Sequence, residues 1–589
     1  MLAAEYLPTC PSLPAAFFKQ VDKAPLRPAQ WERRNGEYVP ITYQMFGNRV
    51  RHVASGLMRA GVKPGDRVGL LMENRPEWAV IDYAILSVGA VTVPLYCSYR
   101  PQDIAYVLDD SGAAVVFTSG GHLLRELKKA ADESEKVRHI YVCEDVDDDE
   151  GAPVHNLAEL EEGDIDEERL NRRLSKLNRD QLATLVYTSG TTANPKGVML
   201  THGNILTNLE AVPAVISLLH EECMLSFLPL AHALERTGSH FLPYSFGISV
   251  AFAERPDTVA KNLGEAKPTM MIAVPRLLEV VRNRILAQVA KQSALKQKLF
   301  HSYFSLAGKE NPGPVAGLLL KLLDRLVGEK IRNRFGGRLR VIVSGGAPLS
   351  VEVGRFFETL GLPVLEGYGL SESAPLLTVN PMHDRRIGTV GPAVRGVEIR
   401  IADDGEIIAR GNNIMSGYWK NSKATREVLI GGWLHTGDIG ELDEDGYLKI
   451  TDRKKDMIVN SGGENIAPQR VEGLLAAEAL IEQVVVYGDQ RPYLVAMIVP
   501  DQEACVVWAE GAGMPESGWR ELAVSDVLRR QIQKQIQHHL KPLNSHEQIR
   551  RIYIQTEPFS IENGLLTPTM KLKRRAVYQE FAEIFESLY

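Results

Sequence analysis

The stretch at residues 187–198 reads Tyr187-Thr188-Ser189-Gly190-Thr191-Thr192-Ala193-Asn194-Pro195-Lys196-Gly197-Val198. Four hydroxyl side chains flank one glycine, and a lysine follows them. Hydroxyl groups can donate hydrogen bonds to phosphate oxygens, the glycine lets backbone N–H groups face an anion, and Lys196 adds a cation. The order Lys-Gly before an apolar run differs from a Walker A loop, in which Gly-Lys-Ser/Thr opens a helix. The stretch therefore predicts a strand over 182–187, a phosphate-binding loop and a second strand over 197–200, whereas the structural alternative is a polar turn.

The bulk composition is that of an ordinary globular protein of more than one domain. The chain has 589 residues, of which 44% are hydrophobic and 24% charged, and its formal net charge is −7. This balance gives no indication of a nucleic-acid partner. Its five cysteines lie far apart without a CxxC pair, which favours a reducing cytoplasm over a disulfide framework or a structural zinc site. Residues 1–8 lack the pattern of a signal peptide, and the longest apolar stretch, 79–97, is interrupted by Asp82 and Pro94, so we expect a buried helix and strand there.

Outward from the loop, apolar periodicity alternates between helix and strand. The spacing predicts a first ordered unit from residue 38, a helix over 45–60, and strands over 68–72, 91–95 and 114–117. Such alternation is typical of an α/β fold with largely parallel sheets.

The pattern of apolar and charged residues changes at a charged turn, 452–456, which is a reasonable domain boundary. Beyond it we predict a helix over 468–480 and strands over 484–487 and 493–499, which together form a small α+β unit.

Residues 276–335 predict several helices rich in Lys and Arg. Within them, five leucines at 318–323 lie beside Lys321, Asp324 and Arg325. The favoured interpretation is core packing of a helical insert. The alternative is a basic amphipathic surface that touches anionic lipid.

Four further segments carry candidate chemistry. After a predicted strand over 339–343, Ser344-Gly345-Gly346-Ala347-Pro348 offers a flat backbone against which a planar base can lie. In Val364-Leu365-Glu366-Gly367-Tyr368-Gly369-Leu370-Ser371-Glu372-Ser373, an aromatic between two glycines can stack on a purine, Ser371 can bind phosphate, and Glu372 offers a hard oxygen to Mg²⁺.

A strand is predicted over the sequence Trp433-Leu434-His435-Thr436-Gly437-Asp438. It ends at the Asp438 carboxylate, which can accept hydrogen bonds from two ribose hydroxyls, and Arg453, further along the chain, could donate to the same sugar or to a phosphate. The basic segment 566–575 is either a solvated tail or the carrier of a mobile lysine for an anionic site. Taken alone, without the stretch at 187–198, Glu372 is better explained as a surface acid near a helix start.

The order of these segments resembles the adenylate-forming superfamily of acyl-CoA synthetases, luciferases and adenylation domains, from about residue 38 to the end. Two features look most like long-chain fatty acid–CoA ligases. They are the helical insert and the sequence Val459-Asn460-Ser461-Gly462-Gly463-Glu464-Asn465. The resemblance implies a large N-terminal α/β domain with stacked sheets and surrounding helices at 1–452, a hinge at 453–455, and a small mobile α+β domain at 456–589. It also implies ATP, Mg²⁺ and coenzyme A as cofactor and substrates, and a long-chain fatty acid as the acid. The cysteine pattern predicts a cytoplasmic location, and the segment from Leu318 to Arg325 together with the apolar substrate is the basis for a hypothesis of peripheral contact at the inner membrane face.

The resemblance also assigns roles by motif match. Thr188 and Glu372 would hold Mg²⁺, and Lys571 would bridge the carboxylate and the α-phosphate. His232 stands where the family has an aromatic residue near the carboxylate. The remaining nucleotide contacts would be Ser189, Gly190, Thr191, Thr192 and Lys196 on the β- and γ-phosphates, Gly346, Ala347, Glu366, Gly367, Tyr368 and Gly369 around adenine, Ser371 beside the phosphates, and Asp438 and Arg453 on the ribose. Lys455 matches the hinge position, and Gly462 and Gly463 would line the pantetheine channel after the small domain rotates.

Some positions differ from the residues usual in the family's motifs. Met570 stands where a glycine usually precedes the lysine, so Lys573 competes with Lys571 for its role, and Asp452 replaces a frequent glycine. No gating tryptophan for an acyl tunnel is identifiable. The alternatives are an acyl-AMP ligase that loads a carrier protein, a medium-chain or aromatic acid–CoA ligase, and an inactive lipid-binding scaffold. The first often carries an insertion near the hinge, and none is obvious at 453–470.

Overall fold

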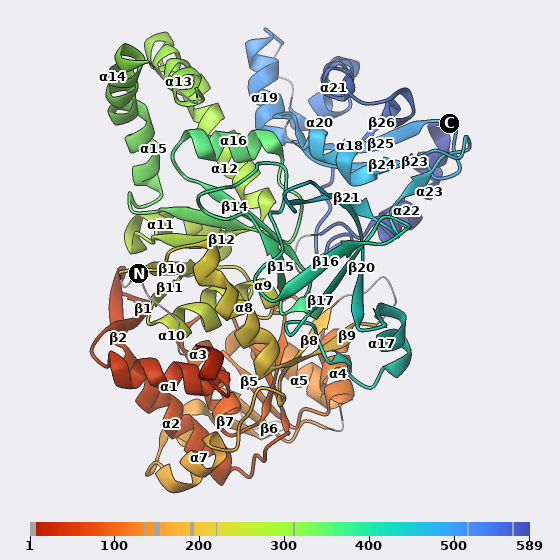
Figure 1. Ribbon diagram of the computed structural model, residues 1–589. Helices are drawn as coiled ribbons and strands as arrows, with labels where there is room; N and C mark the ends of the chain where they lie inside the picture. Colours follow the sequence, from red (N-terminus) through yellow and green to blue (C-terminus); the bar gives the residue numbers. More distant parts are fainter. Residues whose placement is uncertain are drawn as a thin grey trace.

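The computed structural model describes residues 7–134, 136–144, 153–188, 194–219, 221–309, 313–476, 478–514, 518–567 and 571–589. A large α/β body holds two eight-stranded sheets and a five-stranded sheet, and a smaller α+β domain follows it in the chain (Figure 1). The predicted fold class is therefore confirmed.

The first sheet carries the predicted phosphate loop. Its strands, in spatial order, are β18 (Gly417–Tyr418), β9 (Lys196–Thr201), β8 (Leu182–Thr188), β4 (Val91–Leu95), β3 (Arg67–Leu71), β5 (Val115–Thr118), β6 (His139–Val142) and β7 (Val154–Asn156). The strands from β8 to β7 pair in parallel, whereas β9 pairs antiparallel with β8 and with β18. The strand–loop–strand prediction at 182–200 is thus confirmed on both sides of the loop.

The second sheet contains, next to its edge strand, the strand that carries Glu366 and Tyr368. Its order is β15 (Leu376–Val379), β14 (Val364–Gly369), β13 (Val341–Ser344), β12 (Met270–Ala273), β10 (Cys223–Ser226), β11 (Ser249–Phe252), β1 (Pro28–Arg34) and β2 (Glu37–Thr42). The five-stranded sheet has the order β16 (Val397–Ile401), β17 (Glu406–Gly411), β20 (Trp433–Leu442) and β19 (Leu429–Ile430), with β21 (Leu448–Arg453) on β20.

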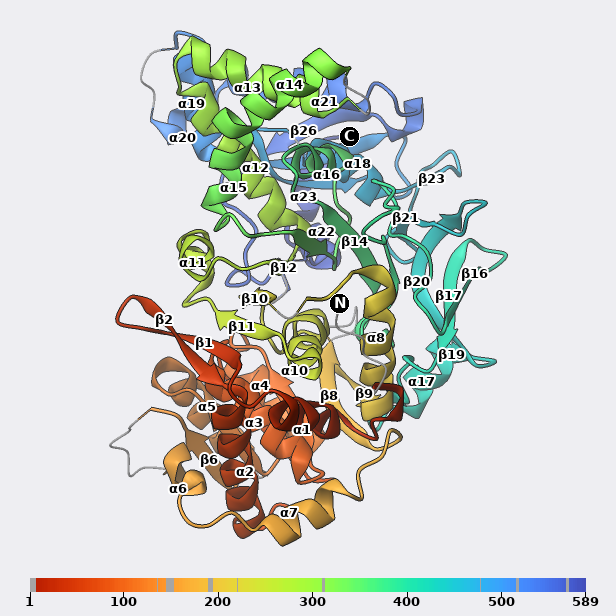
Figure 2. The same cartoon turned by 60° about the vertical axis from the view of Figure 1, so that its left-hand side comes forward.

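Helices surround and separate these sheets (Figure 2). They are α1 (Leu13–Lys23), α2 (Tyr43–Arg59), α3 (Pro76–Ser87), α4 (Pro101–Ser111), α5 (Gly121–Glu133), α6 (Leu157–Glu161), α7 (Glu167–Leu174), α8 (His202–Val215), α9 (Ala233–Glu235), α10 (Leu242–Phe246), α11 (Val259–Ala266), α12 (Pro275–Ala290), α13 (Ala294–Ala307), α14 (Pro314–Leu323), α15 (Glu329–Arg334), α16 (Val351–Thr359) and α17 (Ser422–Val428). Two π-helical turns, η2 (Arg236–Phe241) and η4 (Asp324–Gly328), interrupt the helical runs.

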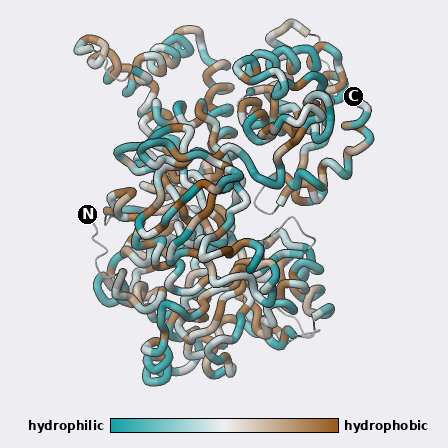
Figure 3. Tube along the Cα trace, turned by 45° about the vertical axis from the view of Figure 1, so that its right-hand side comes forward, coloured by the Kyte–Doolittle hydropathy of each residue, from teal (hydrophilic) through white to brown (hydrophobic). Residues whose placement is uncertain are grey.

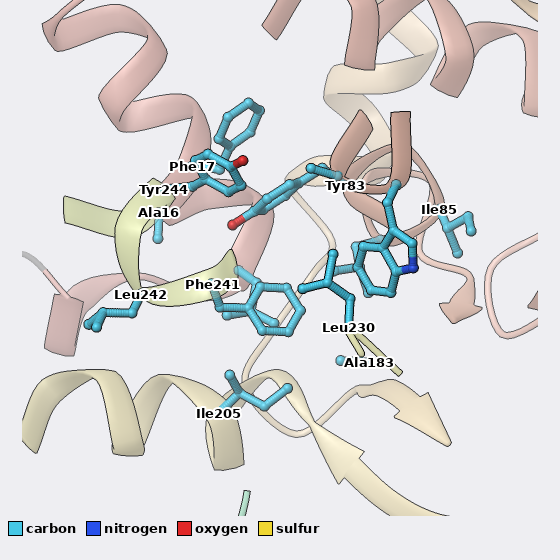
Figure 4. Close-up of a cluster of buried hydrophobic side chains, with 14 of the residues drawn as sticks. Ala16, Phe17, Tyr83, Ile85, Ala183, Ile205, Leu230, Phe241, Leu242 and Tyr244 are labelled. Atoms are coloured by element: carbon cyan, nitrogen blue, oxygen red, sulfur yellow. The ribbon is translucent and has the colours of Figure 1, made fainter. Parts of the chain in front are cut away.

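One buried core joins the two eight-stranded sheets, because a single cluster contains side chains from both. At its centre the rings of Phe17 and Tyr83 stack with centroids 4.3 Å apart, and Phe241 and Tyr244 lie close by (Figure 4). Offset aromatic pairs of this kind add stability beyond the area that they bury. The core therefore fixes α1, α3, η2 and α10 against one another, beneath the loop that precedes α9.

The C-terminal domain packs helices on both faces of a small sheet. The sheet has the order β24 (Ile481–Tyr487), β25 (Leu494–Pro500) and β26 (Ile549–Ile554), and a hairpin of β22 (Ile458–Val459) and β23 (Asn465–Ile466) precedes it. Its helices are α18 (Pro468–Leu475), α19 (Gln502–Gly511), α20 (Trp519–Ala523), α21 (Asp526–Leu540), α22 (Arg574–Glu580) and α23 (Ala582–Ser587). Two separate buried clusters, one on each face, give this domain its own core.

Three expectations are wrong in detail. Ordered structure begins before residue 38, with α1 and β1, because the apolar face of α1 is buried in the main core. Helix α18 ends at Leu475 rather than at 480, because Leu480 accepts a hydrogen bond from the Asp501 amide and the chain enters β24 at Ile481.

The third concerns the leucines of 318–323, for which core packing was favoured. Only Leu323 is buried, and Leu318 is 73% exposed. Among the described residues, no helix is both long and apolar enough to cross a membrane.

Candidate active site

The predicted phosphate loop joins two hydrogen-bonded strands at the edge of the first sheet. Thr188 ends β8 and pairs with Lys196 at the start of β9. Ser189, Gly190, Thr191 and Thr192 lie outside the described residues. The Lys196 ammonium lies over the ring of Tyr418, 5.2 Å from its centroid. A cation and a hydroxyl are thus held on opposite strands at the mouth of the loop.

Tyr418 also reaches the predicted metal ligand. Its hydroxyl donates a 2.7 Å hydrogen bond to Oε1 of Glu372, which lies in the single turn η5 (Ser371–Ser373). The Glu372 carbonyl accepts a 2.8 Å bond from the Met415 amide, so both ends of this residue are held. The sequence did not single out Tyr418, because only the pairing of β18 with β9 brings it to a residue 46 positions away.

Strand β14 supplies the residues expected around adenine. A Cβ on Gly369 would lie 1.7 Å from the Pro375 carbonyl oxygen, so only glycine fits at this position. Burial raises the pKa of Glu366 to about 7, although the Gly388 amide donates to its carboxylate. Gly346 and Ala347 follow β13 as an exposed turn beside β14, where Ser344 pairs with Glu366. Glu366 to Gly369 and the Gly346 turn are therefore neighbours at one end of the second sheet.

Like Glu366, Asp438 is a buried carboxylate of the site. It lies inside β20 rather than at its end, which corrects the prediction, because β20 continues to Leu442 as the partner of β21. One oxygen, Oδ2, accepts a 2.7 Å bond from the Tyr368 hydroxyl. The other oxygen, Oδ1, lies 3.4 Å from Nε of Arg453, its cross-strand partner. Burial raises the pKa of Asp438 despite the attraction of Arg453.

Lys571 of the C-terminal domain reaches this group of residues. A β-bridge pairs Leu566 with Leu572, and the Lys571 amide donates to Oγ1 of Thr567. Burial and the nearby Arg453 lower the pKa of Lys571 to about 8, whereas Asp438 and Glu372 act in the opposite direction. The competing Lys573 is the N-cap residue of α22. The Lys571 ammonium is thus within electrostatic range of the site carboxylates Asp438 and Glu372.

His232 is the N-cap residue of α9 and lies within electrostatic range of Lys571. Its Nδ1 accepts a bond from the Leu234 amide, and burial together with the Lys571 charge lowers its pKa to about 3. Behind it, Glu235 is fully buried and accepts from Ser226 and from the Phe227 amide, at 2.8 and 3.2 Å. Burial raises the pKa of Glu235 to about 8. A neutral imidazole therefore faces the lysine.

Lys455 of the expected hinge and the expected pantetheine residues are exposed. Lys455 is exposed just after β21. Gly462 and Gly463 are exposed in the loop between β22 and β23, where the Asn460 side chain accepts the amides of Gly462 and Glu464. This loop packs on the turn at Arg491, whose carbonyl accepts the Ser461 amide.

A buried ionic network under the site was also missed by the sequence analysis. Asp82 of α3 accepts from Nε of Arg236 at 3.1 Å and lies 2.9 Å from Nε2 of His240, both in η2. Burial alone would raise the pKa of Asp82, but Arg236 and His240 lower it to about 2. Arg236 also donates at 2.6 Å to Thr184 of β8. The network therefore ties η2, which follows the loop of His232, to the strand that leads into the phosphate loop.

The site combines a phosphate-type loop, a carboxylate suited to a hard cation, a ribose-type carboxylate and a lysine from a second domain. The sequence profile described as "AMP-binding enzyme" matches residues 17–419, and that described as "AMP-binding enzyme C-terminal domain" matches 455–589. The chain belongs to the AMP-binding enzyme family. Among curated members, it is 38% identical to the long-chain-fatty-acid–CoA ligase FadD15 of Mycobacterium bovis, over 94% of this chain and 93% of that one. It is 32% identical to the long-chain-fatty-acid–CoA ligase 5 of Rattus norvegicus, over 95% and 85%.

Solved AMP-binding enzymes share the fold. The adenylation domain of a carboxylate reductase from Mycobacterium chelonae superimposes with a TM-score of 0.77 at 23% identity, covering 98% of this chain and 91% of that one. The anthranilate CoA ligase AuaEII, in complex with anthranoyl-AMP, gives a TM-score of 0.73 at 21% identity, with both chains covered completely. At this level of identity the likeness supports the fold alone, and the branch within the AMP-binding enzymes rests on the long-chain ligase relatives.

Proposed function

We propose that this protein is an AMP-forming long-chain fatty acid–CoA ligase. The observation that carries the proposal is the position of Lys571, a lysine of the C-terminal domain whose charge acts on His232 and is acted on by Glu372 and Asp438 of the large domain. A lysine in this position can serve a reaction between two anions, because it offsets their repulsion where they meet.

In the first half-reaction, a carboxylate oxygen of the fatty acid attacks the α-phosphorus of ATP. The bond from that phosphorus to the bridging oxygen breaks, and acyl-AMP and pyrophosphate result. Lys571 would hold the carboxylate and α-phosphate together, and Lys196 would offset charge on the outer phosphates. The neutral His232 would line the carboxylate's approach without adding a competing charge.

The residues present suit a magnesium ion. Glu372 presents a carboxylate held by Tyr418, and Thr188 presents a hydroxyl at the end of β8. Magnesium in proteins is commonly held by one or two carboxylates together with substrate phosphates. Bound there by Glu372 and Thr188, Mg²⁺ would offset phosphate charge and stabilise the charge that develops at phosphorus.

Adenosine recognition would follow the group around Asp438. Its carboxylate is already oriented by Tyr368 and Arg453, so it would accept the ribose hydroxyls without a conformational search. The base would lie between the backbone of Glu366 to Gly369 and the Gly346–Ala347 turn, with Ser371 beside the phosphates.

In the second half-reaction, the sulfur of coenzyme A attacks the acyl carbon, the bond to the phosphate oxygen breaks, and AMP leaves. We propose that the boundary at 452 and the hinge at 453–455, with Lys455 as its pivot, let the domain of residues 456–589 rotate between the steps. Rotation would withdraw Lys571 and bring Gly462 and Gly463 to the pantetheine. The exposure of both glycines leaves them accessible for this second position.

We further propose that the enzyme acts in the cytoplasm and associates peripherally with the membrane, where its apolar substrate gathers. An acid with an acyl chain of this length partitions into lipid, so an enzyme held at the bilayer surface meets its substrate at a higher local concentration.

The test is AMP formation from ATP and Mg²⁺ with palmitate, with and without coenzyme A. We expect turnover that depends on coenzyme A and is lost in Lys571→Ala. Acyl-AMP that accumulates without a response to coenzyme A would instead indicate a carrier-protein acceptor. Turnover with benzoate or octanoate but not palmitate would indicate an aromatic or medium-chain ligase, and lipid binding without ATP consumption an inactive scaffold.

A further inference from the structure

Helices α13 and α14 project from the large domain, away from its sheets (Figure 1). From Pro314 to Arg334 the chain is helical through α14, η4 and α15. Its inner face packs on α13, where Leu323 joins a buried cluster with Phe300 and Tyr303. The outer face has no such partner among the described residues.

We infer that this outer face is a docking surface for an anionic lipid bilayer, and we call it the α14 face. Its large apolar side chains recur at helical spacing and are exposed to 84, 73, 46, 57 and 43%, respectively, at Val315, Leu318, Leu319, Leu322 and Leu326. The projecting helices therefore show hydrophobic segments at their outer end (Figure 3). A row of large apolar side chains in water is costly unless a second apolar phase covers it.

The positive charge around the α14 face indicates that the second apolar phase is an anionic bilayer. Residues 291–334 contain nine Lys or Arg and three Asp or Glu, although the whole chain carries a net charge of −7. Lys321 and Arg325, one helical turn apart, are exposed beside Leu318 and Leu322. One of the acids, Asp324, is bonded to Arg332. An amphipathic helix with leucines on one stripe and cations on its flank is suited to the headgroup region of an anionic bilayer.

A second copy of the chain fits this face less well. A symmetric dimer would place the same patch on both sides of the interface, and the cations of one copy would then face the cations of the other. A bilayer that contains anionic lipid offers the opposite charge together with an apolar interior. Because no described helix can cross the membrane, the α14 face would lie in the plane of the headgroups. The inference deepens the peripheral association proposed above, and its benefit to turnover rests on the proposed function.

The test is co-sedimentation of the full chain with phosphatidylcholine vesicles, with and without phosphatidylglycerol, at low and high salt. We expect binding to the anionic vesicles that weakens at high salt. The double variant Leu318→Ser/Leu322→Ser should lower the partition coefficient about tenfold or more. Lys321→Gln/Arg325→Gln should lower it about fivefold for each cation removed.

Two matched variants control for general effects. Val524 and Val527 are also exposed apolar residues, to 71 and 51%, and lie in the C-terminal domain, so Val524→Ser/Val527→Ser should bind vesicles like the wild type. Arg529→Gln/Arg530→Gln removes two exposed cations from α21 and should likewise change little.

Turnover of albumin-bound palmitate without vesicles separates this inference from the proposed function. All four variants should retain that turnover, whereas its absence from the wild type would count against the ligase proposal alone. Equal binding to neutral and anionic vesicles, or unchanged binding by the α14-face variants, would overturn the inference. A dimer that Leu318→Ser/Leu322→Ser dissociates, in a protein that binds no vesicles, would overturn it as well.

Discussion

The hydroxyl of Tyr418 donates a 2.7 Å hydrogen bond to Oε1 of Glu372, while its ring lies 5.2 Å beneath the Lys196 ammonium. One side chain thus holds two residues of opposite charge that the proposed reaction needs on either side of the phosphates. Loss of a partner that orients a metal ligand typically lowers metal affinity or activity by about 10- to 100-fold.

Tyr418→Phe removes the hydroxyl and keeps the ring under Lys196. We expect the Mg²⁺ affinity, or the adenylation rate at limiting Mg²⁺, to fall about 10- to 100-fold, because Glu372 loses its orienting bond. Added Mg²⁺ should recover part of the rate, which a purely structural defect would not allow. Tyr38→Phe is the matched control, since that hydroxyl bonds to the Phe252 carbonyl at 2.9 Å, far from Glu372. A Mg²⁺ titration identical to that of the wild type would contradict the role given to Tyr418.

Lys571→Ala should slow acyl-AMP formation about 100- to 1,000-fold, because a positioned cation is lost where charge develops. Supplied acyl-AMP should still react with coenzyme A, since the lysine is proposed to leave the site for that step. Lys573→Ala is the matched control and should retain most of the adenylation rate. The measurement is pyrophosphate release in the absence of coenzyme A, and the opposite ranking of the two variants would transfer the role to Lys573.

The pH dependence of adenylation provides a separate test of Lys571. Its pKa in the folded protein is about 8, below the ordinary 10.5, so the free enzyme loses the proton as pH rises through 8. We expect kcat/KM for ATP to fall above that pH. Lys571→Arg, which stays charged, should be slower but should not show this fall. Between pH 8 and 10.5 the unfolded chain holds more protons at this residue, so its contribution to stability rises with pH over that window.

Asp452 forms a link across the proposed hinge. It is buried, and its carboxylate accepts the Gln469 amide at 3.3 Å, at the start of α18 in the C-terminal domain. Burial raises its pKa from 3.8 to about 6, although the Arg453 and Gln469 amides favour the charged form. The folded protein therefore holds more protons at Asp452 between these two pH values, and this contribution to stability is lost as pH rises through about 6.

Asp452→Asn keeps an oxygen acceptor and removes the charge. We expect it to raise the apparent free energy of unfolding by about 1–3 kcal/mol at pH 7.5 and to change little near pH 4. Urea unfolding at both pH values measures this difference. Asp452→Ala also loses the hydrogen bond to Gln469. It should instead favour arrangements of the two domains in which Lys571 lies outside the site, and we expect faster proteolysis after the hinge as the readout. An equal gain at both pH values would contradict the titration argument.

The fold class, a large α/β body with stacked sheets and a smaller α+β unit, could be predicted because apolar periodicity and turn residues are local properties of the chain. Lys196, Glu372 and Lys571 could be proposed as site residues because they stand in short motifs, and their roles stay predictions. Tyr418 could not be predicted, because only the pairing of β18 with β9 brings it to Glu372. Asp438 was expected at a strand end because its run of residues does not show that β21 pairs alongside. The α14 face was predicted to be core for a related reason. The spacing of its leucines predicts an apolar stripe on a helix, but it does not show whether another element packs on that stripe.

The buried network of Asp82 and Arg236 should show the cost of an unpaired buried charge. Both side chains are at most 2% exposed. Asp82→Asn or Arg236→Met alone should lower the free energy of unfolding by about 3–5 kcal/mol, because each leaves the partner charged and without its counterion. The double variant should lose less than the sum of the two, since no charge then remains unpaired. The matched pair is Arg255 and Asp257, joined at 3.0 Å but about 70% exposed, whose removal should leave the free energy of unfolding nearly unchanged. Denaturant unfolding measures all of these, and additive single effects at Asp82 and Arg236 would contradict a coupled network.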